Sequence, residues 1–554
     1  MTPEPVLRDD ANRGQLIDEL LRTPMSRRDA LRRGGMAGLA LTGMSTLLAA
    51  CGGGSTASGS GAQQLVMSSG ATPVTLDPMT SLDGQSPLLW RCVYETLLEF
   101  KGSSTDLEPH LAKAYEYDTK ANRLVFHLRD GITFTDGAAL DAAAVKLNVE
   151  RQMAVNQGIA YALAPIKKIE TPDASTVVLH TSGYSDGLLD GFASLYGLYL
   201  ISPKAIQDHK GKDWAQSWLR SNMVGTGPYQ LENYALNQQA AFTKHDKYWG
   251  GFSGPHFERV VVQYVNDASS ERLQLERGTS SVAFFLPDDD VYAMRDEQGV
   301  DVLNRPAFTT YYIGLPCHTG PTADKRVRQA ISYGFDYDTA NKHILNGTAT
   351  QPHGPLPHTF PGYDASLPRY EYDPDRARKM LADAGHEGGG FELKYIYESG
   401  YYWKRPFGEL FQANMKDLGI TVSTQELSPS TWAAKLQDKS SANEAYGVAW
   451  WPSLATPFDF LWTLFATSAQ GSSGYNFTYY SNKTFDGLLD QATSEVDKAK
   501  RMALYQRCQQ IVVDDAPYLY ISDVNYLLPM ASSLKGAVFN PMYLNVLDPY
   551  ELHT

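Results

Sequence analysis

The sequence is poor in cysteine, in basic residues and in long apolar runs. It holds four Cys among 554 residues, and 48 Lys and Arg stand against 62 Asp and Glu, for a net charge of −14. Beyond Cys51 the remaining thiols are Cys92, Cys317 and Cys508, and three cannot all pair, so no disulfide framework is expected. The acidic balance argues against a nucleic-acid partner, which would need basic patches. No apolar run reaches the roughly 20 residues that a membrane-spanning helix needs.

The N-terminal residues have the pattern of an export signal. Residues 26–33 are rich in Arg, residues 34–48 are weakly apolar, and the string Leu48-Ala49-Ala50-Cys51 follows. A basic segment, an apolar segment and small residues before a cleavage site are typical of exported proteins. We therefore predict that residues 1–50 are an export signal.

The end of this signal indicates lipidation. It resembles the lipobox of bacterial lipoproteins, which implies that the Cys51 thiol carries a diacylglycerol. Residues 51–64 would then be the lipidated Cys and a flexible linker, because Gly and Ser dominate there. The paired Arg27 and Arg28 favour the twin-Arg route, but Ala30 stands where that consensus prefers Phe, so general secretion stays open.

The length and the aromatic content indicate a multidomain protein with a ligand cleft. About 500 residues follow Cys51, which is too many for one core, so two or three domains are expected. Tyr is abundant, with 33 copies, and Trp occurs nine times. Large rings with polar tips suit a cleft that grips an amphipathic solute, and they equally suit an ordinary core.

Strand-like and helix-like segments alternate along the chain. Residues 124–129, 176–180 and 259–265 have the alternation or the β-branched composition of strands. The clearest helix begins with Asp373 as N-cap and Pro374 after it, and ends at Gly385. Apolar residues at helical spacing also predict a helix over 407–418. In a further predicted helix, over 497–513, Leu504 and Cys508 share one face. No period of 20–50 residues is present, so a mixed α/β or α+β fold is expected.

A series of short motifs stands in an order that resembles one family, the family 5 extracytoplasmic solute-binding proteins of ABC importers. Members capture peptides, nickel complexes, opines and some oligosaccharides. The motifs, spread over roughly residues 65 to 530, are 75–78 (TLDP), 93–98 (VYETLL), 107–114 (LEPHLAKA), 125–129 (VFHLR), 131–137 (GITFTDG), 224–229 (VGTGPY), 248–249 (YW), 324–330 (DKRVRQA), 373–385 (DP to AG), 485–489 (FDGLL) and 516–518 (APY).

This resemblance implies a type II periplasmic-binding-protein fold, with two lobes, an extra inserted domain and a hinged cleft. Domain I would be discontinuous, over 65–89, 224–307 and 515–554. Domain II would cover 90–223, and domain III would cover 308–514. A solute that contacts both lobes only when they are shut would drive closure.

The resemblance also implies the role. The chain would be an extracytoplasmic receptor and a monomer, anchored to the membrane through Cys51, which delivers solute to two permease and two ATPase subunits. It would not be an enzyme and would need no cofactor. The sequence has no Gly-Lys-Ser/Thr phosphate loop, so it is not the transporter's own ATPase.

One segment marks the expected ligand site. The family pattern Gly-Trp-x-x-Asp-x-x-x-Pro is matched by residues 449–457, where Trp450 and Trp451 add two large rings. Ser453 stands in the Asp place, where the peptide binders pair with a ligand ammonium. A hydroxyl cannot neutralise a buried ammonium, so recognition of a free peptide amino end is in doubt. Asp459 would substitute only if the loop were rearranged.

Other cleft residues are expected around this segment. Three consecutive aromatics at a helix start cannot all face a core, so at least one is expected to be exposed, and the Arg that follows could receive a carboxylate or phosphate. The low charge of this set suggests a larger neutral or amphipathic solute, either a blocked peptide or an oligosaccharide. The additional candidates are Tyr401, Tyr402, Trp403, Arg405, Tyr311, Asn476, Asp83 and Gln85.

Two other classes compete with this interpretation. Residues 183–187 read Gly-Tyr-Ser-Asp-Gly, the nucleophile elbow of serine hydrolases with Ser185 as nucleophile, but the Gly-rich loop over 386–390 comes about 200 residues too late. The same residues fit a surface turn of domain II. A metal site would use His343, His353 and His358, whose spacings match no recurrent ligand motif, so solvated loop residues are expected instead. The acidic run 288–290 lacks the features of a calcium loop and is expected to be a solvated turn.

The hydrolase alternative has a direct test. A fluorophosphonate probe attacks activated serines, and we expect no labelling of Ser185, because no oxyanion loop precedes it. Labelling at Ser185, located by peptide mass spectrometry, would revive the enzyme interpretation.

Overall fold

The computed structural model describes residues 64–554. The predicted export signal, the predicted lipidation site Cys51 and most of the predicted linker therefore lie outside the described residues. Residues 62–554 form one compact unit. No helix among residues 64–554 has both the length and the apolar character needed to cross a membrane.

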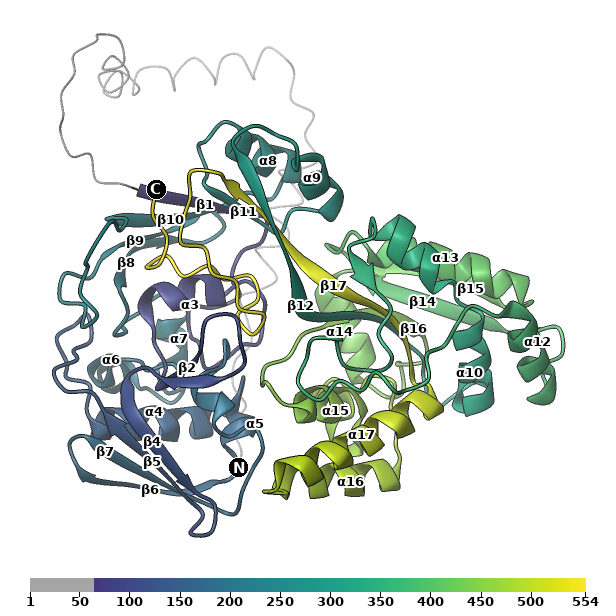
Figure 1. The fold of residues 1–554 in the computed structure, drawn as a ribbon, viewed down its shortest axis with the longest axis horizontal. Helices are drawn as coiled ribbons and strands as arrows, with labels where there is room; N and C mark the ends of the chain where they lie inside the picture. The colour runs from purple at the N-terminus through teal and green to yellow at the C-terminus, as the bar shows by residue number, and fades with distance from the viewer. Residues whose placement is uncertain (1–63) are drawn as a thin grey trace, which may run out of the picture. The chain divides into compact units, whose positions relative to one another are not determined.

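An 11-stranded sheet forms the framework (Figure 1). Its order is β15-β14-β16-β12-β17-β11-β1-β10-β9-β8, and β13 pairs with β17. The strands of this sheet are β1 (Gln64–Ser69), β8 (Tyr229–Ala235), β9 (Gln239–Lys244), β10 (Arg259–Tyr264), β11 (Val282–Phe284), β12 (Val300–Gly314), β13 (Ala349–Thr350), β14 (Glu392–Glu398), β15 (Thr421–Leu427), β16 (Ala445–Trp450) and β17 (Tyr518–Ala531).

Two smaller sheets lie within residues 90–223. One pairs two strands, and the other is antiparallel in the order β4-β5-β7-β6. Their strands are β2 (Leu98–Phe100), β3 (Leu107–Pro109), β4 (Ala112–Asp118), β5 (Arg123–Leu128), β6 (Ile166–Asp173) and β7 (Thr176–Thr181).

Helices occupy much of the remaining chain. The α-helices are α3 (Pro87–Val93), α4 (Ala142–Val155), α5 (Ala160–Leu163), α6 (Pro203–His209), α7 (Gln216–Leu219), α8 (Ala268–Glu276), α9 (Asp288–Ala293), α10 (Lys325–Tyr333), α11 (Tyr337–Thr339), α12 (Pro374–Asp383), α13 (Lys404–Asp417), α14 (Pro429–Gln437), α15 (Pro457–Phe465), α16 (Lys483–Ser494) and α17 (Lys498–Asp515). Single turns of 3-10 or π type are η1 (Asp190–Phe192), η2 (Pro321–Ala323), η3 (Ala340–Ile344), η4 (Thr467–Ala469) and η5 (Gly471–Ser473).

The long strands β12 and β17 lie in the middle of the large sheet, between β16 and β11, and connect its two halves. They pair antiparallel along most of their length, with irregularities between Pro306 and Thr309 and between Tyr311 and Tyr312. Such bulges bend and twist a strand pair locally. The expected boundary between residues 307 and 308 falls at the first irregularity, so a hinge here would need only two strands to bend. The division into domains I, II and III itself stays a prediction.

The local sequence signals are confirmed where they were strongest. The Asp373 carboxylate accepts the N–H of Arg376 at 2.9 Å, Pro374 begins α12, and Gly385 follows its end with a φ of 87°. The strands expected over 124–129, 176–180 and 259–265 are β5, β7 and β10. The periodic apolar face thus predicts the buried side of a helix, as at Ala377 and Leu381.

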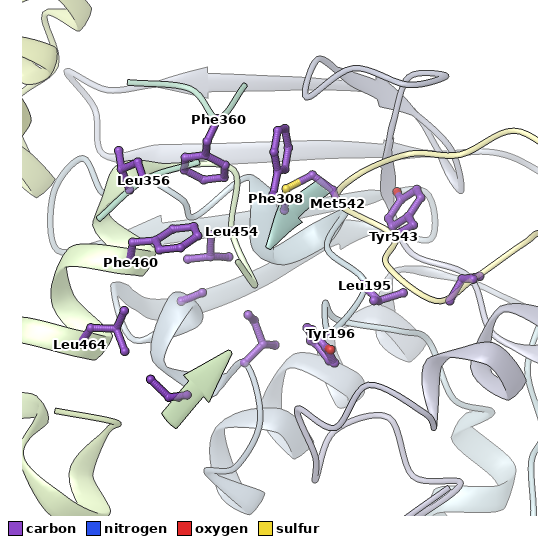
Figure 2. Packing of buried hydrophobic residues seen from close by; sticks show 14 of the residues in the cluster. Leu195, Tyr196, Phe308, Leu356, Phe360, Leu454, Phe460, Leu464, Met542 and Tyr543 are labelled. Carbon is purple, nitrogen blue, oxygen red and sulfur yellow. The ribbon is translucent and has the colours of Figure 1, made fainter. Parts of the chain in front are cut away.

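The core is continuous across the residues that were assigned to different domains. One cluster of buried side chains includes Tyr196, Phe308 and Tyr543, which were assigned to domains II, III and I (Figure 2). Within this cluster the Phe360 ring lies 5.0 Å from that of Phe308 and 5.1 Å from that of Phe460. Cys508 is fully buried in α17 and forms no disulfide, as expected of a thiol on the apolar face of that helix.

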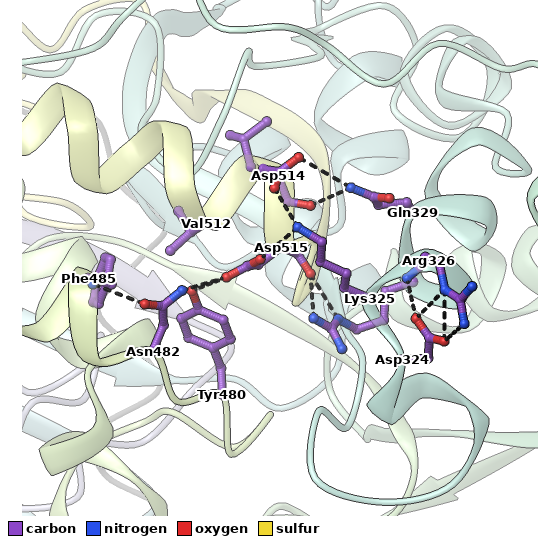
Figure 3. A network of polar contacts seen from close by, with 12 residues as sticks. Asp324, Lys325, Arg326, Gln329, Tyr480, Asn482, Phe485, Val512, Asp514 and Asp515 are labelled. Atoms are coloured by element: carbon purple, nitrogen blue, oxygen red, sulfur yellow. Dashed lines mark hydrogen bonds and ion pairs between the residues drawn. The ribbon is translucent and has the colours of Figure 1, made fainter. Parts of the chain in front are cut away.

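Polar contacts fix the C-terminal end of α17 against the start of α10 (Figure 3). The Lys325 ammonium lies 2.7 Å from the Asp514 carboxylate, and Arg328 donates to the backbone carbonyl of Asp515. The Asp515 carboxylate in turn accepts from Tyr480 and Asn482. The motif 324–330 therefore positions α17, and with it the start of β17.

A buried ion pair explains the first motif of the series. The Asp77 carboxylate and the Arg151 guanidinium form two hydrogen bonds, of 3.0 and 2.5 Å, and both side chains are almost fully buried. The Arg151 Nε–H also donates to the backbone carbonyl of Trp214. This fork ties the loop after β1 to helix α4.

Replacing Asp77 with Asn should destabilise the protein by about 3 kcal/mol or more, because it leaves a buried guanidinium without its counterion. The measurement is the urea unfolding midpoint of the variant against the wild type. Lys146→Gln removes the exposed Lys146–Glu150 pair on the same helix and should change the midpoint little. Equal midpoints for D77N and K146Q would contradict the role assigned to the buried fork.

Candidate functional site

An aromatic cavity of about 240 Å³ lies between a loop after β1, the start of α13 and the end of β16. It is small beside the roughly 300–1,000 Å³ of pockets for drug-sized ligands. Its lining residues are Leu82, Asp83, Gly84, Gln85, Glu398, Tyr401, Lys404, Trp432, Val448, Ala449, Trp450, Trp451, Ser453 and Tyr475.

Five aromatic rings line the cavity, that of Trp432 and four others. Trp450 ends β16, and its ring lies 4.9 Å from that of Tyr475 at an angle of 59°. Its indole N–H is buried and has no acceptor. Trp451 follows, with its indole N–H 2.9 Å from the Tyr196 hydroxyl, and Tyr401, 37% exposed, is the fourth.

The expected Ser453 site is in the cavity wall, but Asp459 is not available to it. The Asp459 carboxylate is fully buried, where it accepts the Ser453 N–H and the Tyr161 hydroxyl at 2.9 and 2.7 Å. Burial raises the pKa of Asp459 to about 7, although both hydrogen bonds work in the opposite direction. Asp459 therefore supports the loop from behind.

The three aromatics at the start of α13 have different surroundings. Tyr401 faces the cavity, which confirms that at least one is exposed. Tyr402 donates its hydroxyl to Asp288, and Trp403 is buried and stacks on Tyr311 with centroids 4.1 Å apart. The Asp288 contact corrects the expectation of a solvated acidic turn: this carboxyl is partly buried at the start of α9, and its pKa is raised to about 6 by burial.

Some expected residues are not brought into the cavity. Arg405 is exposed and pairs with Glu409 on the outer face of α13, at 2.9 Å. Asn476 is fully buried, where its side chain donates to the carbonyls of Ala466 and Tyr480, and its neighbour Tyr475 lines the cavity instead. Tyr311, Tyr402 and Trp403 lie behind the lining and support it. Asp83 and Gln85 are in the lining, as predicted.

The sequence analysis missed an ion pair in the lining. Glu398, the last residue of β14, pairs with Lys404, the first residue of α13. The cavity is therefore charged, whereas a low-charge cleft was expected. The available signal was a Glu and a Lys six residues apart on either side of three aromatic residues, at a strand-to-helix connection where binding groups often gather.

Residues 451–459 are held from behind by residues 161–196. The Ser194 hydroxyl donates to the Ser453 carbonyl, and the Ala455 N–H donates to Asp190 at 2.8 Å. Burial, together with the nearby charge of Asp186, raises the pKa of Asp190 to about 7. These contacts join residues expected in domain II to residues expected in domain III.

The Gly-Tyr-Ser-Asp-Gly turn belongs to this contact region, which corrects the expectation of a plain surface turn. Its Asp186 carboxylate accepts from Thr456 and from Tyr505, the latter at 2.9 Å, and lies 3.2 Å from the Arg501 Nε. Among the described residues, Ser185 makes no hydrogen bond to a His side chain. The turn thus packs against α15 and α17.

The three candidate metal ligands serve other contacts or face solvent. His353 bonds to the backbone carbonyl of Leu367, His358 bonds to Asp523, and His343 is exposed. Across residues 64–554, no three His, Cys, Asp or Glu side chains gather as a metal site. Larger hollows of about 500 and 620 Å³ are lined mainly by polar side chains, such as the already paired Lys325 and Lys342.

Comparison with known proteins agrees with the fold. The profile of the bacterial extracellular solute-binding proteins, family 5 Middle, matches residues 106–472. The Escherichia coli K12 protein named Probable D,D-dipeptide-binding periplasmic protein DdpA is 32% identical, over 87% of this chain and 93% of its own length. Heme-binding protein A of Haemophilus influenzae is 27% identical, over 91% of this chain and 96% of its own length.

Solved structures give the same architecture. The Helicobacter pylori periplasmic binding protein DppA in complex with peptide STSA has a TM-score of 0.78 and 24% identity, over 88% of this chain and 98% of its own. The Pseudoalteromonas dipeptide binding protein in complex with Met-Leu has a TM-score of 0.80 and 18% identity, over 89% of this chain and all of its own. These likenesses show the type II periplasmic-binding-protein fold. Motif order, sheet topology and profile match lead to one conclusion: the chain belongs to the family 5 bacterial extracellular solute-binding proteins.

Proposed function

We propose that the protein is the receptor of an ABC import system and captures a small peptide-like solute in the aromatic cavity. The observation that carries this proposal is the cavity itself, in which Trp450, Trp451 and Tyr475 face the loop that contains Asp83 and Gln85. A small cavity that offers aromatic surfaces for stacking and polar side chains for hydrogen bonds suits an amphipathic solute.

The names of the relatives support the peptide class. One relative is called a probable D,D-dipeptide-binding protein, and another, from Escherichia coli K12 and 25% identical, is called a dipeptide-binding protein. The rings of Trp450, Trp451 and Tyr475 would also suit an oligosaccharide, which is the alternative solute for a receptor of this fold. The cavity volume of about 240 Å³ favours a short peptide or a short sugar over a longer one.

The proposed mechanism is capture followed by closure. The strand pair β12 and β17 would act as the hinge, and a solute seated on Trp450 would bring the loop at Asp83 over it. The bonds from Ser194 and Asp190 to residues 453–455 would then hold the closed form. A solute shifts this equilibrium only by its preference for the closed form.

The remaining parts of the system follow from the family. The receptor would be monomeric, lipid-anchored at Cys51 on the outer side of the cytoplasmic membrane, and would hand its solute to the permease and ATPase subunits. Domain I (65–89, 224–307 and 515–554), domain II (90–223) and domain III (308–514) would be the moving parts. No chemistry is proposed for it.

Replacing Trp450 with Ala should weaken solute binding roughly 30-fold, because central aromatic anchors carry much of the binding energy. Native mass spectrometry of protein purified without refolding first identifies the carried solute. Calorimetric titration of that solute then compares the variant with the wild type.

Trp218→Ala is the matched control, because Trp218 lies in α7 and stacks on His209, away from the cavity. The control should bind normally, and both variants should stay folded. Unchanged affinity in W450A would place the binding site elsewhere, and a carried glycan would favour the oligosaccharide alternative.

Replacing Asp459 with Asn should reduce the pH dependence of stability. The carboxyl has its pKa raised from 3.8 to about 7 in the folded protein, so the folded state holds a proton that the unfolded state loses above about pH 4. Stability from this group is therefore greatest in acid and falls as pH rises to about 7. Melting temperatures from pH 4 to pH 8 should fall less steeply in D459N than in the wild type.

The exposed Asp130, which is 82% exposed beside Lys113, provides the control D130N. Its melting profile should follow that of the wild type. Parallel melting profiles for D459N and the wild type would show that the proton on Asp459 does not contribute to the pH dependence of stability.

A further inference from the structure

The charged groups of the cavity differ in how far they reach the solute space. The Lys404 side chain is only 1% exposed, whereas the Glu398 side chain is 16% exposed. The Lys404 ammonium is covered by the rings of Tyr401, Trp432 and Trp403, with Nζ 4.1, 5.2 and 5.5 Å from their centroids. The cation is sealed behind aromatic rings, while the carboxylate is accessible.

Lys404 therefore holds Glu398 in place. Burial lowers the pKa of Lys404, and the Glu398 charge beside it works in the opposite direction. Only the Glu398 Oε1 accepts from Lys404, and Oε2 accepts no hydrogen bond from the described residues. With only 1% of its side chain exposed, Lys404 offers almost no surface to a solute carboxylate.

Asp83 adds a second negative charge to the same space. Its carboxylate accepts the N–H groups of Gln85 and Ser86 and the Ser81 hydroxyl, all uncharged donors. None of the ion pairs of the described residues includes Asp83, so no cation neutralises it. Asp83, Glu398 and Tyr401 all line the same cavity, and burial together with the charges of both carboxylates raises the pKa of the Tyr401 phenol.

The cavity wall thus has two accessible anions and a sealed cation, and aromatic rings lie between them. Electrostatic attraction and cation–π contact both favour a positive group in such a space. An ammonium would find a carboxylate acceptor on one side and ring faces on the other. The position differs from that of Ser453, which holds no charge.

We propose that Glu398, oriented by Lys404 and assisted by Asp83, receives an ammonium group of the solute, so that the protein selects small amphipathic cations. This inference rests on the proposed function and names the solute class of the same cavity. It replaces the expectation of a neutral solute. Lys404 is a positioning residue, because it acts through Glu398.

The experiment uses calorimetric titration with alanyl-phenylalanine in its L,L and D,D forms, each with a free or an acetylated amino group. A further probe, Nα-acetyl-lysyl-phenylalanine, carries its only ammonium on the side chain. At least one probe with an ammonium should bind at least about tenfold more tightly than the acetylated dipeptides. The lysyl probe separates a peptide amino end from a side-chain amine as the source of the charge.

Glu398→Gln should remove this preference by weakening the ammonium probes at least about tenfold, while binding of the acetylated probes stays unchanged. Because E398Q leaves Lys404 buried without its counterion, the double variant E398Q/K404M is measured as well, since it removes both charges together. Glu409→Gln is the matched control on the outer face of α13, paired with Arg405, and should behave as the wild type.

The outcomes separate this inference from the proposed function. Equal binding of free and acetylated dipeptides, with both weakened in W450A, would overturn the ammonium site and leave the peptide receptor standing. A preference for ammonium that survives in E398Q/K404M would also overturn it. Failure of every probe to bind the wild type would count against both proposals.

Discussion

The hydrogen bonds between residues 190–196 and residues 451–455 are the contacts on which the rest of this structure depends. One side of the segment that begins at the end of β16 presents Trp450, Trp451 and Ser453 to the cavity. Its other side is fastened through Ser194 and Asp190. Because the same few residues line the cavity and contact residues 190–196, a solute that moved the cavity wall would also change this contact, and the proposed capture would be coupled to the proposed closure.

The cavity separates two kinds of recognition. The rings of Trp450 and Tyr475 provide apolar surface that tolerates many solutes, whereas Glu398 and Asp83 provide charge. Lys404 is covered by aromatic rings and pairs with the Glu398 carboxylate. We propose that it orients this carboxylate and does not itself bind a carboxylate of the solute. A shared backbone can thus serve different solutes through the identity of a few side chains at strand and helix ends.

Much of the framework was predictable from the sequence, because its signals are local. Asp373, Pro374 and Gly385 mark a helix wherever it packs, and β-branched runs such as that of β10 mark strands. The order of the motifs gave the fold. The site was less predictable, since adjacent residues of one loop face opposite ways: Tyr475 lines the cavity while Asn476 is buried, and Tyr401 lines it while Trp403 is in the core. The Glu398–Lys404 pair depends on a β-strand end meeting a helix start, so the spacing of the two residues in the sequence did not by itself show that they are in contact.

The most direct test is a crystal structure of the protein purified without refolding, with its carried solute identified by mass spectrometry. The account predicts solute density against the Trp450 ring, with a positively charged nitrogen within hydrogen-bond distance of Glu398. Solute density outside this cavity, or a solute in the cavity whose nearest group to Glu398 is neutral or anionic, would contradict it.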